Sequence, residues 1–462
     1  MPHSHHLLKG GVFATTMAIA ALSGTANASG FAIVETSTSG LGNSFAGGSA
    51  GADDASTIFT NPAGLHFIKR KGAKVVLGAS VIVGDIDFDD EGSTTVLGQN
   101  LNVNDEEGGN GGTVALVPNF YYSRAINDKW QFGLGVNAPF GLATDYDDGF
   151  VGRYHALESE IKTVNINPTL AYKVNNDLSL GFGINVQYIE ARLTNAVDLG
   201  TICAVGQLQG QVAAGTCNAL GLQPQADDSE AEVEADDISY GFNLGLMWQA
   251  NDATRIGLAY RSQIDHDLEG DIDFDNPNAG AAMFASAINL VDGDAEASVR
   301  LPDTFSVGVH HQVNSAWSVV GDLTWTNWSV LDTLEIEFDT GAADSVTTFE
   351  WEDSYRYSFG VNYAPNQDWT WRFGVAYDET PISSSGNRTP RLPDGNRTWI
   401  SAGFSYSPSE NMTIDAGYAH LFFDEADINL STSEAENTFR GNLNGTADLQ
   451  ADILSIGARW TF

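Results

Sequence analysis

The sequence predicts an all-β protein, a fourteen-stranded antiparallel transmembrane β-barrel with an N-terminal plug (hatch) inside its lumen. Three observations lead to this fold class. Apolar residues alternate with small polar residues over most of the chain. Aromatic residues gather near the ends of the alternating segments, and short connections alternate with long ones. Outer-membrane barrels share these features, because each of their strands faces lipid on one side and a polar lumen on the other.

The first 28 residues are interpreted as a signal peptide. Lys9 precedes an apolar stretch at residues 12–22, and residues 26–28 (Ala-Asn-Ala) offer a small-residue cleavage site. This order is typical of export signals, and the apolar stretch is too short to span a membrane. The mature chain is therefore expected to begin near Ser29.

Residues 29–73 are expected to form the plug. They include the small, Gly-rich run SGLGNSFAGGSAGADDASTIFTNPAGL and contain no good strand. A disordered leader is the alternative interpretation of such a composition. A general porin, however, would begin its first strand almost at once, whereas a sealed barrel needs an obstruction in its lumen. The segment therefore favours a plugged channel.

Residues 74–462 are expected to form the barrel. In residues 238–249 (ISYGFNLGLMWQ), one face carries large apolar and aromatic side chains and the other mostly Ser, Gly and Asn. A soluble sandwich would carry many charges on its polar face, whereas lipid requires a closed barrel that satisfies every backbone group. Such segments begin near residues 74, 113, 129, 159, 177, 236, 253, 297, 316, 347, 368, 397, 411 and 446.

The connections between these segments alternate in length. Short turns are predicted at residues 127–128, 175–177, 251–252, 314–315, 365–366 and 408–409. Long loops are predicted around residues 88–112, 143–158, 197–235, 275–296, 339–346, 380–396 and 431–445. Short periplasmic turns, long outer loops and an even strand count are the bacterial outer-membrane pattern.

The third segment is interrupted. Residues 132–136 alternate as a strand does, but Pro139 cannot donate a ladder hydrogen bond, and Gly141 permits backbone angles closed to other residues. The strand could simply end before Pro139. Because Phe140 continues the apolar parity, we expect instead that the segment stays in the wall and kinks inward over Asn137 to Gly141, which leaves a lateral opening.

Charge narrows the range of partners. The chain carries 60 acidic and 21 basic residues, a net charge of −39, which excludes a nucleic-acid partner. Acidic blocks at residues 85–107 and 227–237 are expected to be solvated outer loops. They could bind a divalent cation, but no calcium-loop spacing is present, so we expect no metal and no cofactor.

No catalytic residue is predicted either. The sequence has no GxSxG or HExxH motif, and no nucleophile–base pair can be located in it. A barrel phospholipase with a His and a Ser at the lumen edge is the enzymatic alternative that the sequence leaves open.

The third and fourth long loops contain unusual residues. Cys203 and Cys217 both lie in the third loop and are expected to form a disulfide, since the chain is exported. Apolar residues in the two loops either pack the loops together or form an outward groove that captures a hydrophobic ligand. The candidate groove residues are Leu208, Leu220, Leu222, Met283, Phe284, Ile288 and Leu290.

Two ordered blocks resemble the long-chain fatty-acid outer-membrane transporters (FadL type), and the resemblance covers the whole mature chain. The first comprises Ser39-Gly40-Leu41-Gly42, Asp53-Asp54-Ala55 and the triplet Asn61-Pro62-Ala63. The second comprises Thr380-Pro381, Asn387-Arg388, Pro393-Asp394, Arg397, Trp399 and Ser401-Ala402-Gly403.

The resemblance implies a fourteen-stranded barrel, closed by a hatch, that imports fatty acids or other hydrophobic compounds. It implies a kinked third strand with the hatch triplet, Asn61, Pro62 and Ala63, beside the gap and governing passage to it. It also implies that the third and fourth loops hold a first binding site. At the positions where family members have head-group bases, this chain has Asn195 and Glu352, which leaves a neutral hydrocarbon as an alternative ligand.

Strand parity points Arg261 and Arg356 into the lumen, where either could hold a carboxylate head group. We favour Arg356. The expected protein is a monomeric outer-membrane channel, surrounded by outer-membrane lipid, for passive uptake of long-chain fatty acids or similar hydrophobic molecules. A general diffusion porin is the alternative function.

Overall fold

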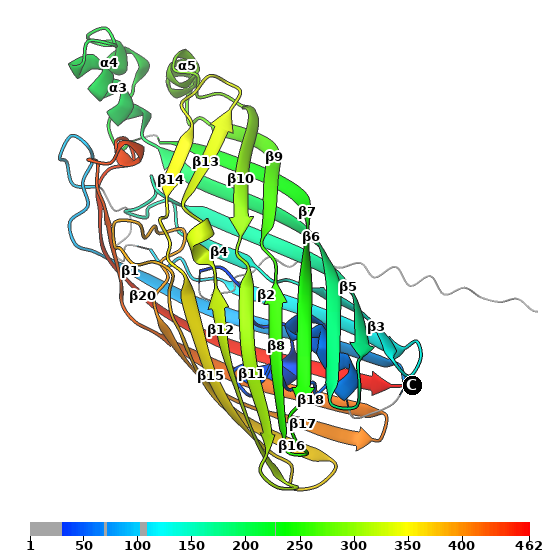
Figure 1. Cartoon of the computed structure of the whole chain (residues 1–462). Helices are drawn as coiled ribbons and strands as arrows, with labels where there is room; N and C mark the ends of the chain where they lie inside the picture. The colour runs from blue at the N-terminus through cyan, green and yellow to red at the C-terminus, as the bar shows by residue number, and fades with distance from the viewer. Residues whose placement is uncertain (1–29, 69–71, 102–108, 227) are drawn as a thin grey trace, which may run out of the picture.

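The alternating segments form one closed antiparallel sheet in the computed structural model, which describes residues 30–68, 72–101, 109–226 and 228–462 (Figure 1). β1 pairs with β2 on one side and with β20 on the other, which closes the barrel. Six wall strands are each interrupted once, so the 20 ladder segments make a 14-stranded wall, as predicted. The predicted signal peptide, residues 1–28, lies outside the described residues.

The strands are β1 Lys74–Asp90, β2 Val114–Ala125, β3 Trp130–Asn137, β4 Gly141–Asp145, β5 Glu158–Lys173, β6 Leu178–Val197, β7 Ser229–Gln249, β8 Thr254–Arg261, β9 Ile264–Asp275, β10 Gly293–Leu301, β11 Thr304–Gln312, β12 Trp317–Thr326, β13 Thr333–Phe338, β14 Ser345–Thr348, β15 Ser354–Tyr363, β16 Trp369–Asp378, β17 Arg397–Ser409, β18 Met412–Phe423, β19 Ala426–Leu430 and β20 Leu443–Thr461. The helices are α1 Thr38–Leu41, α2 Thr57–Thr60, α3 Leu199–Leu208, α4 Thr216–Leu220 and α5 Ala279–Ala287, with 3-10 helices η1 Pro62–Phe67, η2 Trp328–Val330 and η3 Ala435–Asn437. None of these helices is long and apolar enough to cross a membrane.

The outer face of the wall carries the predicted apolar side chains. Tyr240 on β7 is 70% exposed and Ile456 on β20 is 66% exposed, whereas the neighbouring inward residue Asn243 is buried. Large apolar side chains exposed on a soluble surface would be unfavourable, but on a barrel wall they contact lipid. The period of two that predicted the barrel therefore sets which face meets the membrane.

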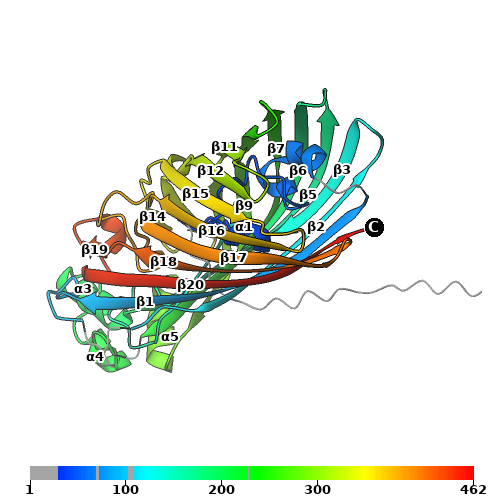
Figure 2. The same ribbon diagram turned by 90° about the horizontal axis from the view of Figure 1, so that it is seen from below.

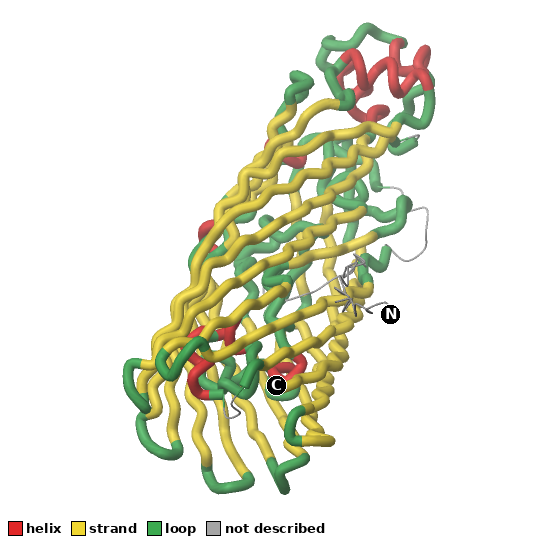
Figure 3. Tube along the Cα trace, turned by 90° about the vertical axis from the view of Figure 1, so that its right-hand side faces the viewer, coloured by secondary structure: helices red, strands yellow, loops and turns green. Residues whose placement is uncertain are grey.

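The short and the long connections lie at opposite ends of the barrel. The short turns lie at the end near the C-terminus, and α3, α4 and α5 stand at the opposite end (Figure 3). Five of the six short turns are where they were predicted, and the sixth is shifted to residues 410–411 because β17 continues to Ser409.

The prediction that residues 227–237 form a solvated loop is wrong for the described part of that block. β7 begins at Ser229, which pairs with Val197 at the end of β6. The acidic residues continue the ladder above the membrane band, because the β6–β7 register runs on without a break. Asp227 and residues 102–108 lie outside the described residues.

The N-terminal segment, residues 30–68, runs inside the ring of strands (Figure 2). Its side chains bond to opposite parts of the wall: the Asn43 amide donates to the Phe373 carbonyl at 3.2 Å, and the Tyr121 hydroxyl donates to the Thr36 carbonyl at 2.8 Å. The wall has a glycine where the segment's backbone touches it. A Cβ on Gly374 would lie 2.1 Å from the Asn43 carbonyl carbon, so only glycine permits this approach.

Candidate functional site

The third wall strand is broken at the predicted place. β3 ends at Asn137, and β4 begins at Gly141. The β2–β3 ladder ends where Phe120 faces Val136. Residues 114–119 of β2 consequently have no ladder partner on this side among the described strands.

The residues between β3 and β4 turn inward and pair with the N-terminal segment instead. The Ile33 N–H donates to the Pro139 carbonyl at 2.8 Å, and the Gly141 N–H donates to the Phe31 carbonyl at 2.9 Å. Ala32 and Phe140 form an isolated antiparallel bridge. Residues 31–33 thus satisfy backbone groups that β2 would satisfy in an unbroken wall.

The expectation that the apolar parity of strand three continues through the break is wrong. Phe140 is only 6% exposed and lies inside the barrel. Its ring is 5.8 Å from that of Phe31 and 6.2 Å from that of Trp328, and Trp351 packs on Trp328 at 5.1 Å. The inward turn reverses the side chain's direction, since burial among aromatic rings is available inside.

Of the triplet Asn61-Pro62-Ala63, Pro62 reaches the cavity beside the break, and Asn61 is anchored elsewhere on the wall. Asn61 is fully buried against β7 and β8, where its amide donates to the carbonyls of Leu246 at 3.1 Å and Leu258 at 3.2 Å. The same amide donates to the Ser49 carbonyl at 2.7 Å. η1, which carries Pro62 and Ala63, packs mainly against β5, β6 and β7 and also contacts β3, and Pro62 lines the same cavity as Pro139 and Phe140.

A cavity of about 170 Å³ lies between the break and the far wall. Ile33, Pro139 and Phe140 line it on the side of the break, and Pro62 lines it from the hatch. Polar lining comes from Arg261, Asp322, Arg356 and Asp378. An apolar space with a few convergent polar groups is the usual form of a small-molecule site.

The two candidate arginines differ in their partners. The Arg356 Nη2 donates to the Ser44 carbonyl at 2.9 Å, and its Nε lies 3.7 Å from the Asp378 carboxylate. Arg261 donates to the Asn185 side-chain oxygen at 2.6 Å and to the Phe59 carbonyl at 2.8 Å. Within the described residues Arg261 has no carboxylate partner, so its charge is the less compensated of the two.

Glu35 is a buried acid that sequence reasoning missed. It lies two residues after Ile33, is fully buried, and neither carboxylate oxygen has a hydrogen-bond partner among the described residues. Burial raises the pKa of its carboxyl from 4.5 to about 7, against the attraction of Arg356 and Arg397. Only its position in the folded N-terminal segment distinguishes Glu35 from the chain's many exposed acids.

The packed position of residues 30–36 inside the barrel should therefore become less stable as pH rises. Below its ordinary pKa of 4.5 the Glu35 carboxyl is neutral whether residues 30–36 are packed in the barrel or released from it. Between pH 4.5 and about 7 the carboxyl ionises readily only when the residues are released, so their packed position loses stability as pH rises. Arg356 on β15, Asp378 on β16 and Arg397 on β17 are the charged groups that face the Glu35 carboxyl.

Hydrogen exchange should show the amides of residues 30–36 better protected at about pH 5 than at about pH 8 after correction for intrinsic exchange rates, and Glu35→Gln should abolish the difference. An unchanged pH dependence in the variant would contradict this assignment.

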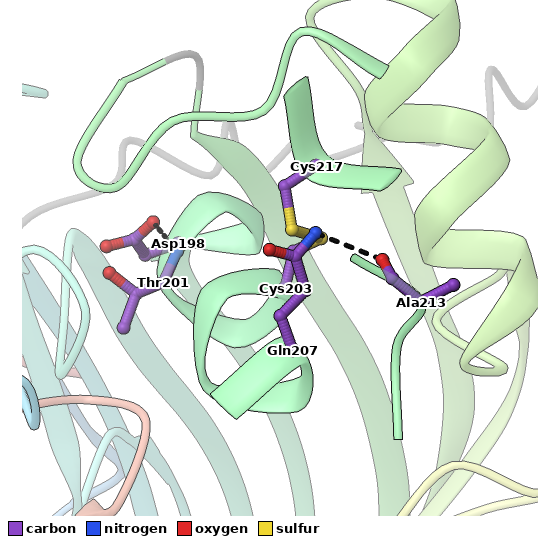
Figure 4. Close-up of a disulfide and its surroundings, with 6 residues drawn as sticks. All are labelled: Asp198, Thr201, Cys203, Gln207, Ala213 and Cys217. Carbon is purple, nitrogen blue, oxygen red and sulfur yellow. Dashed lines mark hydrogen bonds between the residues drawn. A yellow bond between two sulfur atoms is a disulfide. The ribbon is translucent and has the colours of Figure 1, made fainter. Parts of the chain in front are cut away.

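The extracellular cap is built from α3, α4 and α5, and Cys203 and Cys217 are joined by a disulfide within it (Figure 4). Most of the predicted groove residues pack together in this cap. Those in or against its apolar cluster are Leu220, Leu222, Phe284, Ile288 and Leu290. Leu208 is 77% exposed and Met283 is 66% exposed, so these two present apolar surface to solvent.

The described residues contain no group of three or more potential metal ligands. The geometry offers an internal cavity, a broken wall strand and an N-terminal segment held inside the barrel.

The family model and the most similar curated proteins point to the same family of outer-membrane proteins. A family model described as outer membrane protein transport protein (OMPP1/FadL/TodX) matches residues 19–462. Outer membrane protein P1 of Haemophilus influenzae is 30% identical over 474 residues, covering 98% of each chain. The long-chain fatty acid transport protein of Escherichia coli K12 is 29% identical over 447 residues, covering 94% of this chain and 96% of the relative.

Solved structures share the fold. A Pseudomonas aeruginosa FadL homologue superposes with a TM-score of 0.84 at 26% identity, covering 94% of this chain and all (100%) of the other. The toluene transporter TodX of Pseudomonas putida superposes with a TM-score of 0.65 at 18% identity, covering 88% of this chain and 94% of the other. The second likeness concerns the fold alone.

Proposed function

Because this chain belongs to the outer membrane protein transport protein family (OMPP1/FadL/TodX), a family of the bacterial outer membrane, we propose that it takes up long-chain fatty acids or similar hydrophobic compounds by passive diffusion. The observation that carries the proposal is the break in strand three beside an internal cavity. A hydrophobic ligand gains nothing from a water-filled pore, but it is stabilised on leaving sideways into lipid.

The proposed path has three steps. A ligand first meets the exposed apolar side chains of the cap, including Leu208 and Met283. It then occupies the cavity bounded by Pro139 and Phe140. It leaves through the wall between β2 and the inward-turned residues once residues 31–33 move aside.

The N-terminal segment serves as the hatch in this proposal. It blocks the lumen through bonds to several strands, and its triplet Asn61-Pro62-Ala63 anchors it to β6, β7 and β8. The triplet therefore holds the hatch in place, while residues 31–33 govern passage. The proposed division is residues 29–73 for the hatch and 74–462 for the barrel, with residues 1–28 as the signal peptide.

Arg261 is the better candidate for a carboxylate head group than Arg356. Arg356 already faces Asp378, Asp322 and Glu35, whose negative charges offset its own. Arg261 lines the same cavity with only neutral hydrogen-bond acceptors among the described residues. A guanidinium binds a carboxylate through charge-assisted hydrogen bonds, which are stronger than bonds between neutral groups.

Growth on oleate as the sole carbon source tests the proposal. A strain lacking the chromosomal copy should grow when complemented with the wild-type gene. It should grow slowly with Arg261→Met, and it should grow nearly normally with Arg356→Met at equal outer-membrane abundance. Growth of the uncomplemented strain at the wild-type rate would contradict the proposed function. Equal defects for the two variants would contradict only the preference for Arg261.

A further inference from the structure

A second cavity, of about 610 Å³, lies at the end of the barrel that carries the short turns. Asp252, Ser315 and Asp368, each from a different short turn, contribute to its lining. Short turns face the periplasm in outer-membrane barrels, so this cavity is a periplasmic vestibule. Residues 51–55 of the N-terminal segment line it from inside the barrel and are called the floor. The floor therefore separates the vestibule from the interior.

The wall beside the vestibule holds two arginines that share one acid. Arg459 on β20 donates from its Nη2 to the Asp415 carboxylate on β18 at 2.7 Å, and the Arg372 Nη1 on β16 lies 3.9 Å from the same carboxylate. The Ser405 hydroxyl on β17 accepts from Arg372 at 2.5 Å and from Arg459 at 3.0 Å. These side chains are largely shielded from solvent. The wall thus contributes two positive charges and one negative charge to this cluster.

The floor supplies the second negative charge. The Asp54 carboxylate lies 3.3 Å from the Arg459 Nη1, and its side chain is only 5% exposed. Two bonds within the N-terminal segment hold this carboxylate in place: the Ser39 hydroxyl donates to it at 2.7 Å, and the Ser56 N–H donates to it at 2.8 Å. With Asp54 present, the buried cluster contains two guanidiniums and two carboxylates and is neutral.

The preceding residue has the same charge but a different environment. The Asp53 carboxylate lies 3.4 Å from the Arg372 Nη2, and its side chain is 45% exposed. An ion pair so open to water contributes little to stability, because solvent screens it. Asp53 and Asp54 are therefore a matched pair of acids, adjacent in sequence and different in burial.

We propose that Asp54, Arg459, Asp415 and Arg372 form an electrostatic latch that holds the floor against the wall while residues 30–36 move away from the break. The latch keeps the barrel closed to ions during lateral passage of a ligand. The movement of residues 30–36 rests on the proposed uptake function, whereas the closure to ions does not depend on what the protein takes up.

The two ends of the N-terminal segment are held by different forces. Residues 31–33 are held at the break by backbone hydrogen bonds to Pro139 and Gly141 and by apolar packing. A hydrocarbon chain that enters the adjoining cavity can replace apolar contacts. It cannot replace the Asp54 carboxylate, whose removal would leave two buried guanidiniums with one acid. A hydrophobic ligand is therefore expected to displace residues 31–33 and to leave the floor in position.

Planar-bilayer recording of the purified full-length protein tests the latch. Asp54→Asn removes one charge and keeps the side-chain shape, so it should raise the fraction of time spent in open, ion-conducting states at least about tenfold. Asp53→Asn is the matched control and should change this fraction less than about twofold, because Asp53 is half exposed.

A double variant distinguishes charge compensation from loss of packing. Arg459→Gln alone should also raise the open fraction, since Asp54 then lacks its guanidinium. In Asp54→Asn, Arg459→Gln, the remaining Arg372 and Asp415 balance one another, so the open fraction should fall below that of either single variant. Independent packing losses would instead multiply the two rises. Neither Asp53 nor Asp54 belongs to the wall, so their comparison decides the question even where Arg459→Gln assembles poorly.

Three results would overturn the latch: an unchanged open fraction in Asp54→Asn, equal rises in Asp53→Asn and Asp54→Asn, or a double variant whose rise is the product of the single rises. Cells that carry Asp54→Asn should still take up labelled oleate at the wild-type rate, because the latch does not hold residues 30–36. Loss of that uptake would overturn the independence of the two ends. Absence of oleate uptake by the wild type would contradict the uptake function itself, which is a distinguishable result.

Discussion

Replacing Asn61 with alanine should open the closed barrel to small ions. In a fully buried position, the Asn61 amide donates to the wall carbonyls of Leu246 and Leu258, and it also donates to the Ser49 carbonyl within the hatch itself. At about 1 kcal/mol for each of the two bonds to the wall, the loss destabilises the seated hatch by about 2 kcal/mol. That corresponds to a roughly thirtyfold rise in the fraction of channels with a displaced hatch.

Planar-bilayer recording measures this change. The wild type should show rare openings, and Asn61→Ala should show frequent openings of large conductance. Asn110→Ala is the matched control, because Asn110 also donates two side-chain hydrogen bonds, to Asp85 and Asp87, but at the exposed outer surface. Equal conductance of all three proteins would mean that the triplet does not hold the hatch.

The barrel could be predicted because its causes are local. Lipid on one side and polar lumen on the other impose a period of two, and residues 238–249 show it without any knowledge of their neighbours. The break at Pro139 was also predictable, since a missing donor is a property of one residue. The disulfide of Cys203 and Cys217 followed from an exported chain with two cysteines.

The interior could not be predicted, because it depends on which distant segments meet. Phe140 was expected in the wall and lies in an aromatic cluster with Phe31 and Trp328. Glu35 carries no sequence signal, since only burial distinguishes it from the exposed acids. Arg391 lies beside Asn195 although 196 positions separate them, so a single sequence offers no means of pairing the two.

Fixing residues 31–33 to the break should abolish uptake. Ala32 and Phe140 already face one another as antiparallel bridge partners, whose Cα atoms are typically about 4.5 to 5.5 Å apart. That spacing suits a disulfide, so cysteines at both positions should form one. With the bridge closed, the hatch cannot leave the inward-turned residues, and the ligand has no route from the cavity into the bilayer.

The control places a disulfide between two strands, β1 and β20, whose pairing is unbroken. Val81 on β1 faces Leu454 on β20 on the exposed outer face, and a Val81→Cys, Leu454→Cys bridge there should leave uptake near the wild-type rate. The single variants Ala32→Cys and Phe140→Cys report the effect of each side chain alone.

Uptake of labelled oleate by cells carrying the Ala32→Cys, Phe140→Cys protein, measured before and after addition of a reductant, tests the lateral route most directly. Lateral passage predicts uptake at the background level of the deletion strain while the bridge is intact. It also predicts recovery, on reduction, to the rate of the slower single variant. Wild-type uptake with the bridge demonstrably closed would show that the ligand does not leave through the break in strand three.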